Sequence, residues 1–364
     1  MKFRAATVAL ALCATTFTQP AKAGYNAEID LSNPRIVPIY TSSVDAIPNA
    51  GNQASYSGFL YSSRIVFSAA HSEYQFDSQG NKIMFGAKYA FVGKPNSTAG
   101  DYSGLIKVEK RFIAKGYRYN NAAVDDFAVY VLEKDLIPAP PVKLLTPELE
   151  LEIRESRTPI KMYGYGEYKD RCDANEKLPC TSKYQKTLQP RSLTTILRTL
   201  QEVEAIVGYE RKQLENHLIM NNGKAGFGCG GDSGGSITST YKNEFIYLAT
   251  TPNGMNGYAC GASGDYDGKG GINYASPVYK HLDIVKEAEE YVAAAIAQEA
   301  IEKAKAKPTP SPTPSPSASP TPVAKPIAAP KKSTITCVKG KTGKNVTGVN
   351  PKCPKGYKKI KIRP

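Results

Sequence analysis

Tryptophan is absent from this chain of 364 residues, histidine occurs only three times, and residues 307–364 contain no aspartate or glutamate. The three histidines, His71, His217 and His281, are scattered, and none lies near a cysteine. A protein metal site needs several such ligands close together. Neither a metal ion nor another cofactor is therefore expected.

Long apolar runs are also missing. The run Ala5–Phe17 is too short to span a bilayer, and no transmembrane segment is expected. Lys2 and Arg4 precede this run and Ala21-Lys22-Ala23 follows it, which is typical of a secretory signal. We therefore expect residues 1–23 to be a signal peptide removed after Ala23, and the mature protein to be secreted.

Seven cysteines are present, and Cys13 leaves with the signal peptide. The six that remain are Cys172, Cys180, Cys229, Cys260, Cys337 and Cys353. An even number of cysteines in an exported chain predicts disulfides rather than metal ligands or free thiols.

The net charge of +14 is distributed unevenly. Removing the +3 of the first 23 residues and the +13 of residues 307–364 leaves −2 for residues 24–306. The basic character belongs to the C-terminal segment, so nucleic-acid binding by the whole protein is not expected. Residues 307–332 repeat proline with serine, threonine and alanine, which predicts an extended linker. Residues 333–364 then form a basic tail module, in which a small disulfide-closed loop is expected because this segment cannot hold a core.

Between these ends, short apolar or alternating runs are separated by Gly, Pro, Asn and Asp. They predict strands at residues 57–70, 83–92, 104–114, 127–132, 159–163, 244–251 and 271–275, and therefore an all-β barrel or sandwich. Helical spacing occurs over residues 194–216, where Gly208 weakens the middle, and over residues 277–305, where Pro277 fits the first turn. The second helix is expected to dock through Val278, Leu282, Val285, Val292 and Ile296.

Three short motifs carry residues suited to acyl transfer. Residues 228–236 read Gly-Cys-Gly-Gly-Asp-Ser-Gly-Gly-Ser, a glycine-rich turn around Ser233. Ser68-Ala69-Ala70-His71 ends an apolar strand, and Asp125-Asp126-Phe127-Ala128 opens another. A serine hydroxyl becomes a good nucleophile when a neutral imidazole takes its proton, and a carboxylate fixes that imidazole in the correct tautomer.

In the order His, Asp, Ser, these motifs resemble those of the trypsin-like (chymotrypsin-fold) serine proteases, over roughly residues 36–300. The resemblance implies an all-β domain at 36–306, with two antiparallel six-stranded β-barrels and a C-terminal helix. It implies that Ser233 is the nucleophile, His71 the general base and Asp126 the orienting carboxylate. Asp126 fits the family's Asp-aliphatic-Ala pattern better than Asp125 does. The amides of Gly231 and Ser233 would form the oxyanion hole.

The resemblance also assigns a substrate pocket. Phe227, six residues before Ser233, occupies the floor position, with Gly228 beside it. Thr250 and Thr251 are alternatives for the pocket-wall position that pairs with the substrate backbone, and Gly271 is a further candidate. The family selects Arg or Lys with an Asp at the floor, whereas Phe offers no charge. A small or apolar side chain is therefore expected at the primary site.

The cysteines match the family in part. Cys229 and Cys260 fall where the family joins two walls of its pocket, and Cys172 and Cys180 would close a small loop after Gly164-Tyr165-Gly166. The family's bridge beside the catalytic histidine is missing, since Tyr56 and Ser72 occupy its two positions.

Arg35-Ile36-Val37 resembles the family's activation junction, although Pro38 replaces the usual glycine. Cleavage there frees an Ile amine that pairs with the Asp before the nucleophile, here Asp232. Residues 24–35 are therefore a candidate propeptide. If Phe227 excludes Arg, a separate activating protease would have to cut after Arg35.

The leading hypothesis is a secreted serine endopeptidase that cleaves protein or peptide substrates without Arg or Lys specificity. The absence of tryptophan, the Pro-rich linker and the style of the signal favour a bacterial source. The competing hypothesis is a catalytically silent, protease-like binding protein attached to the cell envelope by its tail. Attachment of residues 333–364 to an anionic cell-envelope polymer, which would place the protein at the cell wall, and a merely solvated basic tail both remain open.

Overall fold

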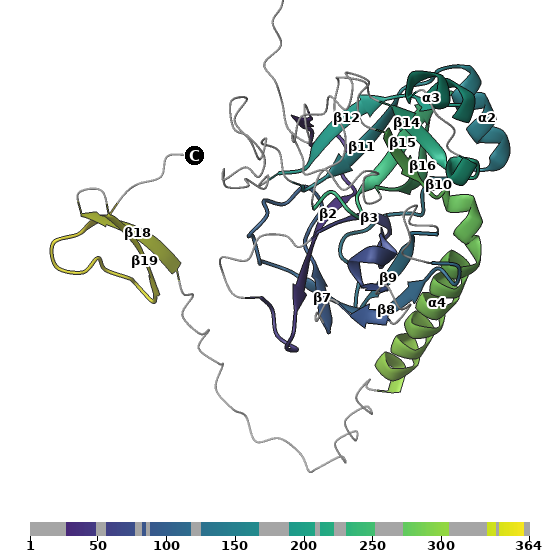
Figure 1. Ribbon diagram of the computed structural model, residues 1–364. Helices are drawn as coiled ribbons and strands as arrows, with labels where there is room; N and C mark the ends of the chain where they lie inside the picture. The colour runs from purple at the N-terminus through teal and green to yellow at the C-terminus, as the bar shows by residue number, and fades with distance from the viewer. Residues whose placement is uncertain are drawn as a thin grey trace, which may run out of the picture. The chain divides into compact units, whose positions relative to one another are not determined.

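The structure is a computed structural model (Figure 1). It describes residues 27–48, 56–76, 82–84, 88–117, 125–166, 189–207, 212–221, 231–251, 272–305, 333–339 and 342–359. The chain divides into two compact units, Met1–Lys305 and Ala306–Pro364, and each is described by itself.

Six strands of the first unit close into a barrel with the order β2-β3-β4-β9-β8-β7. The strands are β2 (Ile36–Ser42), β3 (Tyr56–Ser62), β4 (Ile65–Ser68), β7 (Tyr89–Val92), β8 (Ile106–Ile113) and β9 (Ala128–Leu132). Neighbouring strands pair antiparallel. Alternate residues such as Val37 and Ile39 pack in one apolar cluster, while Ile36 and Tyr40 pack in another with the second half of the unit. Both faces of β9 and of the first part of β2 are therefore buried, which explains unbroken apolar runs such as residues 127–132.

The second half of this unit contains two further sheets. The larger has the order β1 (Glu28–Ile29), β12 (Arg191–Thr195), β11 (Ile160–Gly164), β15 (Ser236–Tyr241), β16 (Glu244–Thr250) and β10 (Lys143–Leu144). The smaller joins β13 (Leu197–Arg198), β14 (Leu218–Asn221) and β17 (Ile272–Ala275), and a separate hairpin pairs β5 (Tyr74–Phe76) with β6 (Lys82–Met84).

The sequence predicts two closed barrels, whereas a single barrel closes within the described ranges. In the second half, the chain passes from the larger sheet to the smaller one between Thr195 and Leu197. The hydrogen-bond ladder is interrupted there, so these strands form two sheets rather than one closed cylinder.

The described helices are α2 (Pro147–Glu155), α3 (Leu200–Val207) and α4 (Leu282–Lys305), with 3-10 turns η1 (Ala70–Ser72), η2 (Lys212–Leu214) and η4 (Val278–His281). The sequence analysis missed α2, which begins at Pro147 and is capped by the Thr146 hydroxyl, an acceptor for the Leu149 amide at 3.3 Å. The predicted helix over 194–216 is wrong at its start, because the β-branched residues 194–195 continue β12. Within the described residues, α3 covers Leu200–Val207 and η2 covers Lys212–Leu214.

The predicted C-terminal helix is confirmed as η4 followed by α4, which lies against β8 and β9 (Figure 1). Its buried side chains include Val278, Val285 and Ala288, but Leu282 and Ile296 of the predicted face are 46% and 48% exposed. A 3-10 helix has fewer residues per turn than an α-helix, and Leu282 stands where η4 changes to α4, which accounts for its exposure.

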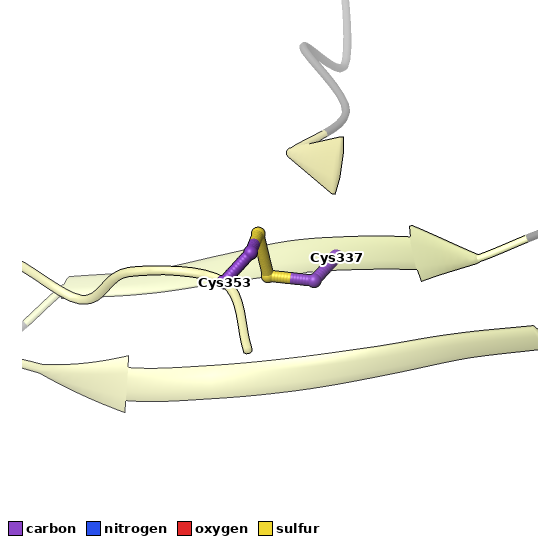
Figure 2. Close-up of a disulfide and its surroundings, with 2 residues drawn as sticks. All are labelled: Cys337 and Cys353. Carbon is purple, nitrogen blue, oxygen red and sulfur yellow. A yellow bond between two sulfur atoms is a disulfide. The ribbon is translucent and has the colours of Figure 1, made fainter. Parts of the chain in front are cut away.

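The second unit is a small sheet with the order β19-β18-β20, formed by β18 (Ser333–Lys339), β19 (Thr342–Gly348) and β20 (Lys358–Lys359). Cys337 and Cys353 form a disulfide with their Cα atoms 5.6 Å apart (Figure 2). The sequence predicted a disulfide-closed loop, and the structure adds three paired strands to it. Exposed lysines of this unit include Lys344, Lys352, Lys355 and Lys358.

No helix in the described part of the chain has the length and apolar character needed to cross a membrane.

His217 and His281, which lie in none of the three sequence motifs, are both buried. The imidazole of His281 lies 2.8 Å from the Ser276 hydroxyl through Nε2 and stacks on the ring of Phe127, with the ring centres 5.0 Å apart. His217 meets the ring of Tyr274 edge-on at 5.3 Å. Burial lowers the pKa of each imidazole to about 4.

These two histidines make the protein less stable in mild acid. Between pH 7 and pH 5 the unfolded chain protonates both imidazoles, with an ordinary pKa near 6.5, while the folded chain keeps them neutral. The free energy of unfolding should therefore fall by roughly 2 kcal/mol for each histidine over this range. Urea unfolding at the two pH values measures the loss, and His281→Gln should remove about half of it. Equal stability of the unmodified protein at pH 7 and pH 5 would contradict this result.

Candidate active site

His71 lies in η1, directly after strand β4 of the barrel. The turn is closed by two backbone hydrogen bonds, from the Ser72 amide to Ala69 at 3.3 Å and from the Glu73 amide to Ala70 at 3.0 Å. Ala69 and Ala70 are fully buried, so the small side chains of the Ala-Ala-His segment let the turn pack closely beneath the imidazole.

Asp126 is the carboxylate that contacts His71. It immediately precedes Phe127 and strand β9, the neighbour of β4 in the barrel, and it is 2% exposed. Its Oδ2 lies 2.6 Å from Nδ1 of His71, and its Oδ1 accepts the backbone amide of His71 at 2.9 Å. The carboxylate therefore orients both the ring and the main chain of this residue.

Ser233 meets the other side of the same ring, with Oγ 2.7 Å from Nε2 of His71. Its backbone carbonyl accepts the amide of Ser57 in β3 at 2.9 Å. The sequence-predicted residues His71, Asp126 and Ser233 are thus brought together in one hydrogen-bonded line from carboxylate to hydroxyl.

The turn around Ser233 requires glycine where the chain passes closest to its neighbours. Gly234 has φ +79°, and a Cβ there would lie 2.3 Å from Oγ of Ser68 and 2.4 Å from the carbonyl oxygen of Ser57. A Cβ on Gly235 would lie 1.9 Å from the carbonyl oxygen of Tyr163. A larger residue at either position would push the nucleophile turn away from β3 and β11.

The segment before Ser233 is held by the loop after β11. Oδ1 of Asp232 accepts the amide of Gly166 at 2.7 Å. The hydroxyl of Ser57 donates to the carbonyl of Gly231 at 2.9 Å and accepts the amide of Tyr165 at 2.8 Å. These contacts hold the segment that contains Gly231 and Ser233. That the amides of these two residues form an oxyanion hole stays a prediction.

Thr250 and Thr251, the two alternatives for the pocket wall, are both buried beside the site. The Thr250 hydroxyl donates to the backbone carbonyl of Asp126 at 3.1 Å. The main chain of Thr251 pairs with the nucleophile turn, its amide with the carbonyl of Gly235 at 2.8 Å and its carbonyl with the amide of Gly234 at 2.9 Å. Both threonines therefore brace the site, and their contact with a substrate stays a prediction.

Several predicted residues lie outside the described part of the chain. They are Phe227, Gly228 and Gly271 of the expected pocket and Cys172, Cys180, Cys229 and Cys260 of the expected disulfides. A separate cavity of about 680 Å³ is lined by residues that include Arg35, Lys161 and Phe245, but by none of the three residues of the hydrogen-bonded line.

Ile36 and Arg35, the predicted activation junction, are held within the fold of the uncut chain. Ile36 begins β2, is fully buried and pairs with Phe59 of β3. The Arg35 guanidinium donates to the carbonyls of Leu60, Tyr61 and Pro140, each at 3.0 Å. The hypothesis that Ile36 pairs with Asp232 after cleavage stays a prediction, and it requires Ile36 to leave β2.

Sequence reasoning missed Ser57, which bridges Gly231 and Tyr165, and Glu73, which is buried two residues after His71. Nothing in the local pattern distinguishes Ser57 from other strand residues. Glu73 had one available signal, since a charged residue directly after a buried histidine turn needs partners of its own.

Comparison with known proteins supports the fold. No protein-family model and no curated protein matches the chain. Among solved structures, the chain is similar to a collagenase of the chymotrypsin fold, titled HL collagenase and solved at 1.7 Å, with a TM-score of 0.50 and 13% identity. The match covers 72% of this chain and 96% of the collagenase. The first unit therefore has a trypsin-like fold.

Proposed function

We propose that the protein is a secreted serine endopeptidase that hydrolyses peptide bonds through an acyl-enzyme on Ser233. The observation that carries this proposal is the line from Asp126 through His71 to Ser233, with contacts of 2.6 and 2.7 Å. The trypsin-like fold is consistent with it, because that fold is where such a line of side chains is expected.

The geometry supports a direct route for the proton. Nε2 of His71 takes the Ser233 hydroxyl proton as Oγ attacks the substrate carbonyl carbon. Asp126 keeps Nδ1 protonated and stabilises the imidazolium ion that forms. The amides of Gly231 and Ser233 would bind the resulting oxyanion, and His71 then gives its proton to the leaving amine. Water attacks the acyl-enzyme by the same sequence of transfers.

Substitution of His71, Asp126 or Ser233 should lower kcat far more than substitution of a neighbouring residue. Ser233→Ala or His71→Ala should lower kcat about 10⁶-fold, and Asp126→Asn about 10⁴-fold because the imidazole loses its orientation. Asp125→Asn is the matched control, since Asn also tolerates the positive φ of +57° at this position. Its kcat should stay within about twofold of the unmodified enzyme. Peptide hydrolysis that survives in the Ser233→Ala protein would contradict the assignment.

The proposed pocket floor predicts which substrates are cleaved. A cationic primary-site side chain would lose water beside Phe227 without gaining a partner. In a series of peptides that differ at this residue alone, kcat/KM should be at least about tenfold lower for Arg and Lys than for small or apolar residues. Phe227→Asp should narrow that gap. Preferred cleavage after Arg or Lys by the unmodified enzyme would exclude the proposal for Phe227.

The proposed activation step is tested by the start of the chain. If cleavage before Ile36 activates the enzyme through Asp232, a chain starting at Ile36 should be active, and one starting at Gly24 should be inactive until it is cut. N-terminal sequencing of active secreted protein shows where the active chain begins. The kcat of the two chains shows whether cleavage before Ile36 is needed for activity. Full activity of a chain that starts at Gly24 would show that residues 24–35 belong to the mature enzyme.

The second unit adds a proposed role in localisation. The segment 307–364 has no acidic residue, and Lys344, Lys352, Lys355 and Lys358 are exposed. Such a surface attracts polyanions, and the attraction weakens as salt increases. Attachment to an anionic cell-envelope polymer remains the proposal for this unit, with a solvated tail as the alternative.

A further inference from the structure

Glu73 is a buried carboxylate in the turn that carries His71. It is 7% exposed, and its backbone amide closes η1 by donating to Ala70 at 3.0 Å. A carboxylate removed from water destabilises the fold unless charged or hydrogen-bonding groups surround it. Its partners therefore determine where the end of this turn can lie.

Three side chains from three barrel strands bind this carboxylate. The hydroxyl of Tyr56 in β3 donates to Oε1 at 3.3 Å, and the hydroxyl of Tyr130 in β9 donates to the same oxygen. Nε of Arg111 in β8 lies 3.3 Å from Oε2. Burial, together with the charge of Glu73, raises the pKa of both phenols, so they stay neutral donors.

The network connects the two chain segments that carry His71 and Asp126. Tyr130 follows Asp126 by four residues and is fully buried in the same segment. Glu73 follows His71 by two residues. The bond between Tyr130 and Glu73 therefore joins the segment that carries the imidazole to the segment that carries its carboxylate, beyond the direct contact of 2.6 Å between them.

We propose that Glu73 is a positioning residue for His71, acting through Tyr56, Tyr130 and Arg111. The network replaces a covalent connection, since Tyr56 and Ser72 occupy the two positions of the bridge that the resembling proteases carry beside this histidine. The η1 turn is held before His71 by the pairing of β4 with β9, and after His71 by the contacts of the Glu73 carboxylate. This inference rests on the proposed function, because the positioning matters through the proton transfer at Nε2.

Glu150 supplies a matched control. It is also 7% exposed, its Oε2 accepts the Tyr279 hydroxyl at 2.8 Å, and it forms an ion pair with Arg154. Its partners lie on α2 and η4, and neither belongs to the network around Glu73. Replacing either glutamate by glutamine removes a buried charge with one arginine and at least one phenol beside it.

The first measurement compares the kinetics of Glu73→Gln with those of Glu150→Gln. Both should lower the melting temperature, but Glu73→Gln alone should lower kcat, by about tenfold or more, with KM unchanged. Tyr130→Phe, which removes one hydroxyl and keeps the ring, should give a smaller loss of kcat. If the kcat of Glu73→Gln equals that of Glu150→Gln, the positioning role is excluded.

The second measurement does not depend on turnover. The Nδ1 proton of His71, shielded by Asp126, should exchange with solvent faster in Glu73→Gln than in Glu150→Gln, as followed by NMR of histidine-labelled protein. If the unmodified protein hydrolyses no peptide, the proposed function fails. The comparison of proton exchange in the two variants still shows whether Glu73 positions the His71 imidazole. If Glu73→Gln does not fold, Tyr130→Phe takes its place. Unchanged exchange would overturn the inference.

Discussion

The buried carboxylate of Asp126 constrains the arrangement of the whole first barrel. A carboxylate that is 2% exposed needs strong donors, and His71 provides both its backbone amide and Nδ1. Those two donors reach Asp126 because β4 and β9 pair directly, with Ser68 opposite Ala128. The register of these two strands therefore places the imidazole, and the Glu73 network holds the same turn from its other end.

The second half of the unit meets this framework through the nucleophile turn. Gly234 and Gly235 fit against β3 and β11 with no room for a side chain, and the Thr251 main chain pairs with both. Ser57, a strand residue of the barrel, binds the carbonyl of Gly231 and the amide of Tyr165. Ser233 consequently reaches His71 only when both halves are packed together, which couples folding of the domain to the formation of the site.

The three residues that the structure brings together could be named from the sequence because each belongs to a short motif. His71, Asp126 and Ser233 could be named, and the strands around them could be located, since both depend on local patterns. The arrangement of the strands in the second half was not predictable in the same way. It depends on the point near Thr195 at which the chain passes from one sheet to the other. The exposure of Leu282 was not predictable for a related reason, because the 3-10 turn at Val278–His281 directly precedes it.

Glu73 and Ser57 illustrate what sequence patterns leave out. Their roles come from contacts between residues far apart in the chain, such as the bond from Tyr130 to Glu73 and the bond from Ser57 to Gly231. The absence of cysteine at positions 56 and 72 was visible in the sequence, but the polar side chains that surround Glu73 were not. No single motif encodes these buried contacts, because they join residues of three barrel strands.

Modification of the protein by a fluorophosphonate tests whether Asp126, His71 and Ser233 together make a working nucleophile. We expect one covalent adduct, located on Ser233 by mass spectrometry. We expect no adduct after Ser233→Ala and slower labelling after His71→Ala. A properly folded protein that stays unlabelled, whichever N-terminus it carries, would exclude such a nucleophile and favour a catalytically silent binding protein.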